Sequence, residues 1–492
     1  MIEFLHSMVT PVNFLMMNMG VAAGIIIGAL PGLNVVFAIA VLLPFTFGMD
    51  SVAGMYLLLG TYCGGTFGGS ISAILINTPG TPSACATVFD GYPMAQHGKA
   101  GDALKISLVC SCIGGILSCL ALIFLAPQIA KAASKFGAPE FFSLCIFGMS
   151  AAVGIAGNKP IKGLVMVCFG LMISTVGIDT TEGVQRFMFG QTKLLAGIAP
   201  VTVMLGVFAL TEVLDKSRAL AEKSFNQDGT VVYTKASLKT MEIFRYWKTI
   251  VRSSAIGIVI GAIPGTGGAI AAMLSYNEAR RKSKCADDFG HGTIEGIMAP
   301  ETGNNATTGA TLIPLLTLGI PGDASVAVLL GALTMQGIIP GPSLFSRDSI
   351  WVYAIMGGLL IINILLWLQG SIFIRLFANI VRVPLEILLP CIVTLCILGA
   401  FSISNSVFDI LLMNIFGIIG YGLRKNDFPL PPLIISLVLG NFMESNLRRS
   451  LVLSQGSAMI FLTRPVSVCI LVLSFFSLFY PLLRRIAGRS KM

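Results

Sequence analysis

Long apolar stretches separated by short polar turns run through almost the whole chain. Charge is nearly absent from the stretches near 102–126, 141–156, 161–178, 350–374, 385–401, 407–421 and 460–483. Several of these reach the roughly 20 apolar residues that a helix needs to span the hydrocarbon core of a bilayer. The pattern predicts an all-α polytopic membrane protein with about 10–12 membrane-embedded helical segments.

Composition and charge agree with this class. Charged residues make up 11% of the 492-residue chain, against about 25% in an ordinary soluble domain. The basic residues lie in short loops and in the C-terminal "RRIAGRSKM", which is typical of positive-inside topology and not of nucleic-acid binding. Because no Lys or Arg precedes the first apolar run, we expect that run to remain as a membrane helix and not as a removable signal peptide.

The chain contains two similar halves. "GIIIGALPG" at 24–32 returns as "GIVIGAIPG" at 257–265, and "NTPGTPSA" at 77–84 returns as "GIPGDASV" at 319–326. "LGVF" at 205–208 returns as "LGNF" at 439–442, so the three matches keep their order. The halves are predicted at 11–214 and 247–450, with a polar linker at 215–246 and a C-terminal helix and basic tail at 451–492.

Charge in the loops favours inverted halves. The segment "NEARRKSK" at 277–284 is strongly basic and therefore expected on the cytoplasmic side, whereas its counterpart "PFTFGMDS" at 44–51 has no Lys or Arg. Against inversion, the basic pairs at 216–218 and 448–449 fall near equivalent positions. Inversion is the preferred interpretation, and a parallel arrangement remains open.

Pro-Gly pairs interrupt the apolar segments at corresponding places in both halves. Proline removes a backbone donor and clashes with the preceding turn, and glycine permits left-handed geometry, so such a pair ends a helix. In a membrane these breaks survive only inside protein or beside a watery cavity. The sequence therefore predicts Pro-Gly-broken helices or re-entrant hairpins.

Small polar residues gather at these breaks and define the candidate site. Helix N-termini offer N–H groups to an anion, and unwound carbonyls can hold a cation. The candidate substrate-binding residues are Pro31, Gly32, Asn34, Asn77, Thr78, Pro79, Gly80, Thr81, Ser83, Pro264, Gly265, Thr266, Gly267, Asn304, Asn305, Pro321, Gly322 and Ser325. Asp323, with Asn305 and Thr308, is the candidate Na⁺ site, because a carboxylate there would repel a carboxylate substrate.

Packing is the competing interpretation of the small residues. Glycines at 20, 24 and 28, at 60, 64 and 68, and at 257, 261 and 265 follow small-xxx-small spacing, for which close helix contact is sufficient. The polarity around the Pro-Gly pairs is not needed for packing. Glu212 and Glu444 can be functional or interfacial. Asp179 and Glu182 are expected in a solvated loop.

The long motifs resemble one family. "GALPGL", "GTFGGSISAILINTPGTPSACATVFDGYPMAQHGKAGDAL", "APETGNNATTGATLIPLLTLGIPGDASVAVLLGAL", "GIIPGP" and "LGNFMESNLRRSL" resemble the large membrane subunit of the tripartite tricarboxylate transporters, the TctA family. The resemblance covers essentially the whole chain. It departs at Thr302 and Gly303, where the family more often has small apolar residues.

The resemblance implies a function, partners and a location. It implies cation-gradient-driven uptake of an organic anion across a bacterial inner membrane, coupled to Na⁺ or H⁺, with no cofactor. It also implies a small four-helix membrane subunit and a periplasmic solute-binding protein.

The alternatives are a passive channel and a membrane-embedded enzyme. No H-E-x-x-H occurs, and "GYPMAQHGKA" at 91–100 lacks the spacing and the Ser/Thr of a phosphate-binding loop.

Overall fold

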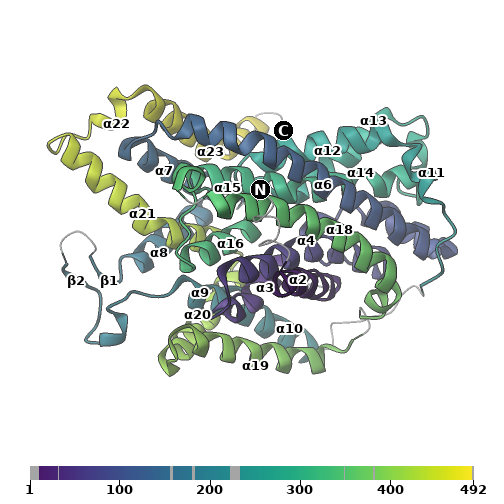
Figure 1. Ribbon diagram of the computed structural model, residues 1–492, viewed down its shortest axis with the longest axis horizontal. Helices are drawn as coiled ribbons and strands as arrows, with labels where there is room; N and C mark the ends of the chain where they lie inside the picture. Colours follow the sequence, from purple (N-terminus) through teal and green to yellow (C-terminus); the bar gives the residue numbers. More distant parts are fainter. Residues whose placement is uncertain are drawn as a thin grey trace.

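The computed structural model describes residues 10–30, 33–155, 159–179, 183–221, 233–347, 349–380 and 383–489. Within these ranges the chain is helical almost throughout, apart from one short antiparallel hairpin (Figure 1). Six helices of the described part are long and apolar enough to cross a membrane, and five further apolar helices have 10–17 residues. The predicted class of an all-α polytopic membrane protein is confirmed.

The elements up to residue 221 form one continuous series. They are α2 (Pro11–Ala29), α3 (Val35–Leu42), α4 (Ser51–Ile76), α5 (Val88–Met94), α6 (Ala100–Ala133), α7 (Ala138–Ile155), α8 (Pro160–Ser174), β1 (Gly177–Ile178), β2 (Gln185–Arg186), α9 (Pro200–Met204) and α10 (Thr211–Ala221). A π-helical segment, Leu205–Leu210, joins α9 to α10.

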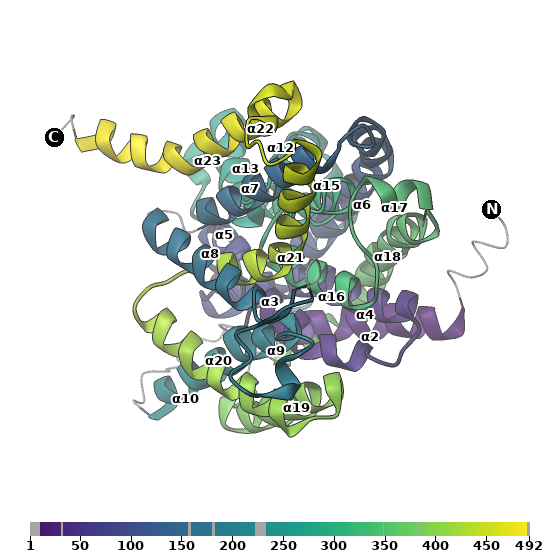
Figure 2. The same cartoon turned by 90° about the vertical axis from the view of Figure 1, so that its left-hand side faces the viewer.

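The remaining elements begin at residue 240. They are α11 (Thr240–Phe244), α12 (Trp247–Ala262), α13 (Gly267–Lys282), α14 (Ile294–Ala310), α15 (Leu312–Leu318), α16 (Ala324–Met335), α17 (Pro342–Arg347), α18 (Ser349–Ile380), α19 (Leu385–Ser404), α20 (Val407–Lys425), α21 (Pro431–Leu453), α22 (Ile460–Thr463) and α23 (Pro465–Arg489). The last helix, α23, extends away from the bundle toward the C-terminus (Figure 2).

Helix α4 lies at the centre of the bundle, where almost all of its residues are buried. Its glycines allow α2 to pack directly on its backbone. A Cβ added at Gly28 would lie 2.4 Å from the backbone oxygen of Gly65, and one at Gly64 would lie 2.4 Å from that of Val21. Side chains larger than hydrogen do not fit at these positions, so the packing role predicted for this glycine spacing is confirmed here.

Helix α12 approaches α14 in the same way. A Cβ at Gly257 would lie 2.3 Å from the backbone oxygen of Gly303.

The C-terminal ends of α2 and α12 have the same geometry. Leu30 and Ile263 each follow the last helical residue in an extended conformation and donate their N–H to a carbonyl three residues earlier.

The helices end at or just before the Pro-Gly pairs that the structure describes. Asn77 follows the last residue of α4 and Gly319 follows the last residue of α15, and both adopt left-handed backbone geometry. Pro79-Gly80 and Pro321-Gly322 follow in non-helical segments, and Pro264-Gly265 forms the turn between α12 and α13. Pro31 and Gly32 lie outside the described residues. Asn34, Thr266 and Asp323, the residues that precede α3, α13 and α16, lie around one space inside the bundle.

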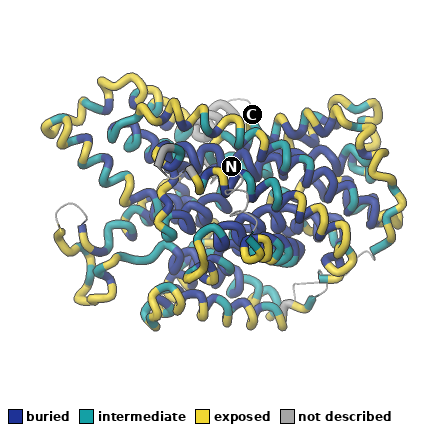
Figure 3. Tube along the Cα trace, viewed as in Figure 1, coloured by how far each residue is buried: buried dark blue, intermediate teal, exposed yellow. Residues whose placement is uncertain are grey.

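Buried residues follow the inner helices, and exposed residues lie on the periphery (Figure 3). The outer helices α18, α19, α20 and α23 present large apolar side chains to the outside, including Ile372, Ile387, Ile418 and Phe476. Apolar side chains on the outer surface are expected where lipid or another membrane protein covers a helix.

The expected solvation of Asp179 is wrong. Asp179 is only 4% exposed, and its carboxylate lies 2.7 Å from Arg448 on α21 and 3.4 Å from Arg186 on β2. Arg186 also pairs with Glu444 at 2.8 Å. The hairpin fold brings these charges together over a long sequence separation, which composition alone does not reveal. Glu182 lies outside the described residues.

Candidate functional site

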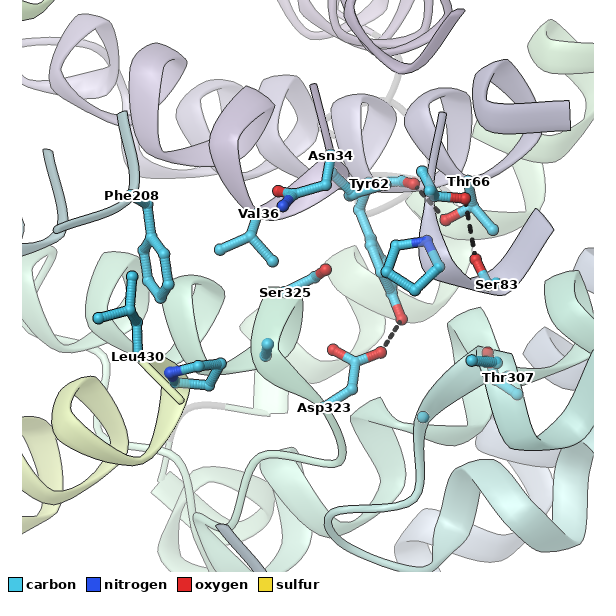
Figure 4. Close-up of a pocket in the computed structure, with 18 of the residues that line it drawn as sticks. Asn34, Val36, Tyr62, Thr66, Ser83, Phe208, Thr307, Asp323, Ser325 and Leu430 are labelled. Atoms are coloured by element: carbon cyan, nitrogen blue, oxygen red, sulfur yellow. Dashed lines mark hydrogen bonds between the residues drawn. The ribbon is translucent and has the colours of Figure 1, made fainter. Parts of the chain in front are cut away.

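A cavity of about 430 Å³ lies where the broken helices meet. Figure 4 shows its polar side chains arriving from α3 and α4 on one side and from α14 and α16 on the other. Its lining comprises Asn34, Val35, Val36, Tyr62, Thr66, Thr81, Pro82, Ser83, Val207, Phe208, Glu212, Gly265, Thr266, Gly267, Gly268, Ala269, Asn304, Thr307, Asp323, Ala324, Ser325, Arg424, Phe428, Leu430 and Pro431.

Two helices begin at this cavity with side-chain caps. Asn34 caps α3, where its Oδ1 accepts from the N–H of Phe37 at 2.9 Å. Asp323 caps α16, where its Oδ1 accepts from the N–H of Val326 at 2.8 Å. Each cap satisfies one of the N–H groups that a helix start leaves without a partner. The positive ends of both helix dipoles therefore lie at the cavity wall.

The other carboxylate oxygen of Asp323, Oδ2, is hydrogen-bonded to α4 at the centre of the bundle. Tyr62 on α4 donates to Asp323 Oδ2 at 3.1 Å, and its hydroxyl lies 3.0 Å from that of Thr311 at the end of α14. Figure 4 shows the Tyr62 ring reaching across the cavity toward Asp323. This contact joins the two parts of the chain across a sequence separation of 261 residues.

The turn at Pro264-Gly265 forms the cavity wall beside the start of α16. Gly265 and Gly267 have φ of +83° and +69°, a geometry that side chains strongly disfavour. The N–H of Gly265 donates to the carbonyl of Gly322 at 2.9 Å, so the turn after α12 is bonded directly to the Pro-Gly segment before α16. Thr266 turns its hydroxyl back onto the carbonyls of Ile260 and Ile263.

Hydroxyl and amide groups complete the polar surface. Thr81 and Ser83 lie 3.1 Å apart, oxygen to oxygen. Asn304 on α14 is 1% exposed, and its side-chain Nδ2 has no hydrogen-bond partner among the described residues. A buried amide donor without a partner is costly and is expected to find one when a solute enters.

One end of the cavity carries a charged pair. Arg424, in the last turn of α20, forms an ion pair with Glu212, in the first turn of α10, and its Nη2 lies 3.5 Å from Asp215. Glu212 is 2% exposed, and its Oε1 has no hydrogen-bond partner among the described residues. Of the two acids left open in the sequence, Glu212 therefore lines the cavity, whereas Glu444 belongs to the ion-pair group of the hairpin.

The structure brings a subset of the predicted substrate-binding residues to the cavity. Eight of them line it: Asn34, Thr81, Ser83, Gly265, Thr266, Gly267, Asn304 and Ser325. Asp323 lines it as well. The other described candidates do not line it: Asn77, Thr78, Pro79, Gly80, Pro264, Asn305, Pro321 and Gly322.

The three residues of the candidate Na⁺ site have separate hydrogen-bond partners. The Asn305 amide donates to the Ser111 hydroxyl and the Glu301 carbonyl, at 2.8 and 3.0 Å. Thr308 donates to the Asn305 carbonyl at 2.8 Å. Neither of these side chains is hydrogen-bonded to Asp323 among the described contacts.

The sequence does not predict several of the lining residues, because they lie within regular helices. Tyr62 and Thr66 lie in the middle of α4, and Arg424 lies at the end of α20, all without a local break. In the sequence, Arg424 is a charged residue next to an apolar segment, a pattern that fits an anchor at the membrane interface as well as a site residue. The packing of α20 against α10 places it at the cavity.

The fold and the cavity define a multi-pass helical membrane protein with a cavity of solute size, in which polar groups are set among apolar side chains. The model of the tripartite tricarboxylate transporter TctA family matches residues 14–435. The chain belongs to this family, whose members are large subunits of tricarboxylate transporters, and membership points to a transporter and not to an enzyme.

Two proteins of Agrobacterium vitis are similar to this chain. An uncharacterized 52.8 kDa protein in the TAR-I ttuC' 3' region is 37% identical over 462 residues, which cover 94% of this chain and 91% of the relative. An uncharacterized protein in the TAR-II ttuC' 3' region is 37% identical over 233 residues, 47% of this chain and 96% of the relative. No solved structure matches.

Proposed function

We propose that this chain is the large transmembrane subunit of a binding-protein-dependent secondary transporter that takes up organic anions such as tricarboxylates, driven by a cation gradient. The observation that carries the proposal is the cavity of about 430 Å³ at which broken helices from both parts of the chain meet. Transporter sites of this kind use helix N-termini for anionic groups and unwound backbone for ions.

The substrate carboxylates would be recognised by donors on the cavity wall. The starts of α3 and α16 supply backbone N–H groups and positive dipole ends. Asn304 supplies an amide, and Ser83 and Ser325 supply hydroxyl groups. Arg424 adds a guanidinium, whose planar donors match a carboxylate well. A di- or tricarboxylate can use several of these donors at once.

The coupling cation would lie near Asp323, with Asn305 and Thr308 on the neighbouring helix as further oxygen ligands. Oxygen donors suit a hard cation such as Na⁺. Asp323 supports the proposal because it places a carboxylate at the wall of the cavity, where a negative charge is costly unless a cation accompanies it.

We further propose that the halves 11–214 and 247–450 are inverted repeats. The order of elements and the matching ends of α2 and α12 support the repeat: α2, α3 and α4 are followed by a Pro-Gly segment, and so are α12, α13 and the α14–α15 pair. The charge difference between the basic segment 277–284 and its counterpart 44–51, which has no Lys or Arg, supports inversion. In such transporters the site lies where the repeats meet.

The proposed setting is a bacterial inner membrane, with a small four-helix membrane subunit and a periplasmic solute-binding protein as partners. Reconstituted uptake tests this directly. Proteoliposomes containing this chain and the small subunit are supplied with a cation gradient and a panel of citrate, isocitrate, malate, succinate and fumarate. Saturable uptake of at least one member is expected only after the binding protein is added.

The alternatives give different results in the same assay. A passive channel would give flux that neither saturates nor accumulates substrate against its gradient. A membrane-embedded enzyme would convert a panel member without moving it. Full uptake in the absence of the binding protein would contradict the proposed dependence on that partner.

A further inference from the structure

The ion pair at one end of the cavity joins two helices that other contacts already hold together. Glu212 lies on α10 and Arg424 on α20. The hydroxyl of Thr211, the residue before Glu212, is buried and donates to the carbonyl of Gly417 on α20 at 3.2 Å. A Cβ added at Gly417 would lie 2.4 Å from the side chain of Leu210. The contact between α10 and α20 therefore does not rest on the ion pair.

The end of α20 is also held from another direction. Lys159, just before α8, forms an ion pair with Asp427 at 2.7 Å. The ammonium of Lys162, in the first turn of α8, lies 4.8 Å from the centre of the Phe428 ring. Both contacts fix the turn that follows α20. Arg424 can therefore change its partner by rotating its own side chain, while the backbone that carries it stays in place.

The bond between Arg424 and Glu212 leaves one carboxylate oxygen unused. Arg424 donates to Oε2 of Glu212, whereas Oε1 is buried and has no hydrogen-bond partner among the described residues. In the buried pair of Glu140 with Arg464, both oxygens are used: Oε1 accepts from Arg464 at 3.3 Å and Oε2 from the N–H of Gly137 at 2.8 Å. A buried carboxylate oxygen without a donor is costly. The Glu212 pair is therefore easier to exchange than the Glu140 pair.

Arg424 is accessible to a solute that enters the cavity. Its side chain is 41% exposed, against 3% for Glu212, and both residues line the cavity. Among the described lining residues, Arg424 is the one that carries a full positive charge. A guanidinium binds a carboxylate best through two parallel hydrogen bonds. A mobile substrate carboxylate can adopt that geometry, whereas Glu212 uses one oxygen.

We propose that Glu212 is an internal competitor of the substrate, an inference that rests on the transport function proposed above. In the empty cavity, Glu212 neutralises the Arg424 guanidinium. When substrate enters, one of its carboxylates takes the guanidinium and Glu212 is released. When substrate leaves, Glu212 returns to Arg424 and so favours its departure. No covalent bond or proton changes in this exchange of one carboxylate for another.

The released Glu212 carboxylate has a second cation within reach. Lys216 lies four residues further along α10, on the same face of the helix and partly buried. A glutamate four residues before a lysine is a favourable pair on a helix. The negative charge of Glu212 is therefore compensated in both states: by Arg424 when the cavity is empty, and by Lys216 when substrate is bound.

The test measures how tightly the cavity itself binds substrate. The purified membrane complex of this chain with its small subunit is titrated with the radiolabelled panel carboxylate that shows the highest uptake. Glu212→Gln keeps the size of the side chain but removes the competing charge. If Arg424 is free in about a tenth of the empty molecules, its release tightens binding about tenfold. We expect a gain of this size, together with slower counterflow, because substrate now leaves without a competitor.

A double-mutant cycle links the gain to Arg424. In an Arg424→Gln background, Glu212→Gln should give no gain in affinity, because the group for which the two carboxylates compete is missing. Glu140→Gln is the matched control. It breaks the fully bonded pair with Arg464, which does not line the cavity. It should lower thermal stability and leave substrate affinity unchanged.

The outcomes separate this inference from the transport function. Unchanged or weaker binding in Glu212→Gln would overturn it, and so would a gain that persists in the Arg424→Gln background. If Glu212→Gln does not insert, Glu212→Asp keeps the charge on a shorter side chain and should show a smaller gain. Failure of both to insert would mean that the pair is required for packing, which also overturns the inference. Absence of saturable uptake by the wild type would instead contradict the transport function itself.

Discussion

Helices α3 and α16 begin at the same cavity and pack on one another, yet they are capped differently. Asn34 and Asp323 make the same bond, from side-chain Oδ1 to the N–H three residues later. An amide and a carboxylate are about equally good caps. The amide at α3 shows that capping at this cavity does not require charge. For the Asp323 carboxylate we propose a second role, as a ligand of the coupling cation.

The two helix starts differ also in how they are held. The Asp323 carboxylate is fixed by Tyr62 and, through that hydroxyl, by Thr311. The preceding Gly322 is bonded through its carbonyl to Gly265. The start of α16 is thus tied to two other parts of the cavity wall. A movement of this helix start would therefore also displace Tyr62 and Gly265, whereas the structure shows no such links for the start of α3 among the described contacts.

The largest effect is expected from Gly322→Val. A Cβ at this position would lie 2.7 Å from Cβ and 2.8 Å from Cα of Thr311, so the Asp323 region must move. Uptake should be abolished while the protein still inserts in the membrane. Gly422→Val, where nothing lies within 4 Å of the added Cβ, is the control and should transport normally. Normal transport by both variants would mean that the start of α16 is not part of the site.

The next effect comes from exchanging the two caps. Asp323→Asn keeps an acceptor for Val326 but removes the charge. The cation concentration for half-maximal uptake should rise by at least about tenfold, which corresponds to about 1.4 kcal/mol. Asn34→Asp adds a negative charge beside the substrate, so it should weaken apparent substrate affinity by a similar factor. Unchanged cation dependence in Asp323→Asn would leave its carboxylate as a cap only.

The smallest effect is expected from removing the capping hydrogen bond itself, which Asn34 and Asp323 both make. Asn34→Ala and Asp323→Ala each remove a capping bond, worth about 0.5–2 kcal/mol. Thermal unfolding in detergent should detect a modest loss in both. If capping were all that Asp323 does, the two alanine variants would also lose the same amount of uptake at saturating cation.

Local signals explain what the sequence could predict of this site. Proline, glycine and capping residues mark a helix break through their own backbone preferences, so the sequence predicts Asn34, Thr81, Gly265, Asp323 and Ser325 without any knowledge of packing. The all-α membrane class follows from the long apolar runs for the same reason. These features depend on neighbours within a few residues.

The features that the sequence does not predict depend on contacts between distant segments of the chain. Tyr62 and Arg424 reach the cavity only because α4 crosses the centre of the bundle and α20 packs on α10. The Glu301 carboxylate accepts hydrogen bonds from four hydroxyl groups, all of which come from residues 190 or more positions away. Asp179 is buried because a hairpin folds it against α21. No local pattern contains such information.

The most direct test asks whether substrate occupies the cavity. Ser325→Cys is introduced after the native cysteines have been replaced, and the variant is first shown to transport. Its reaction with a small thiosulfonate reagent is then followed with increasing amounts of the transported carboxylate. Substrate should slow the reaction, with half-maximal protection near the concentration that half-saturates uptake. Labelling that stays equally fast at saturating substrate, in a variant that still transports, would place the substrate elsewhere and contradict the assignment of this cavity.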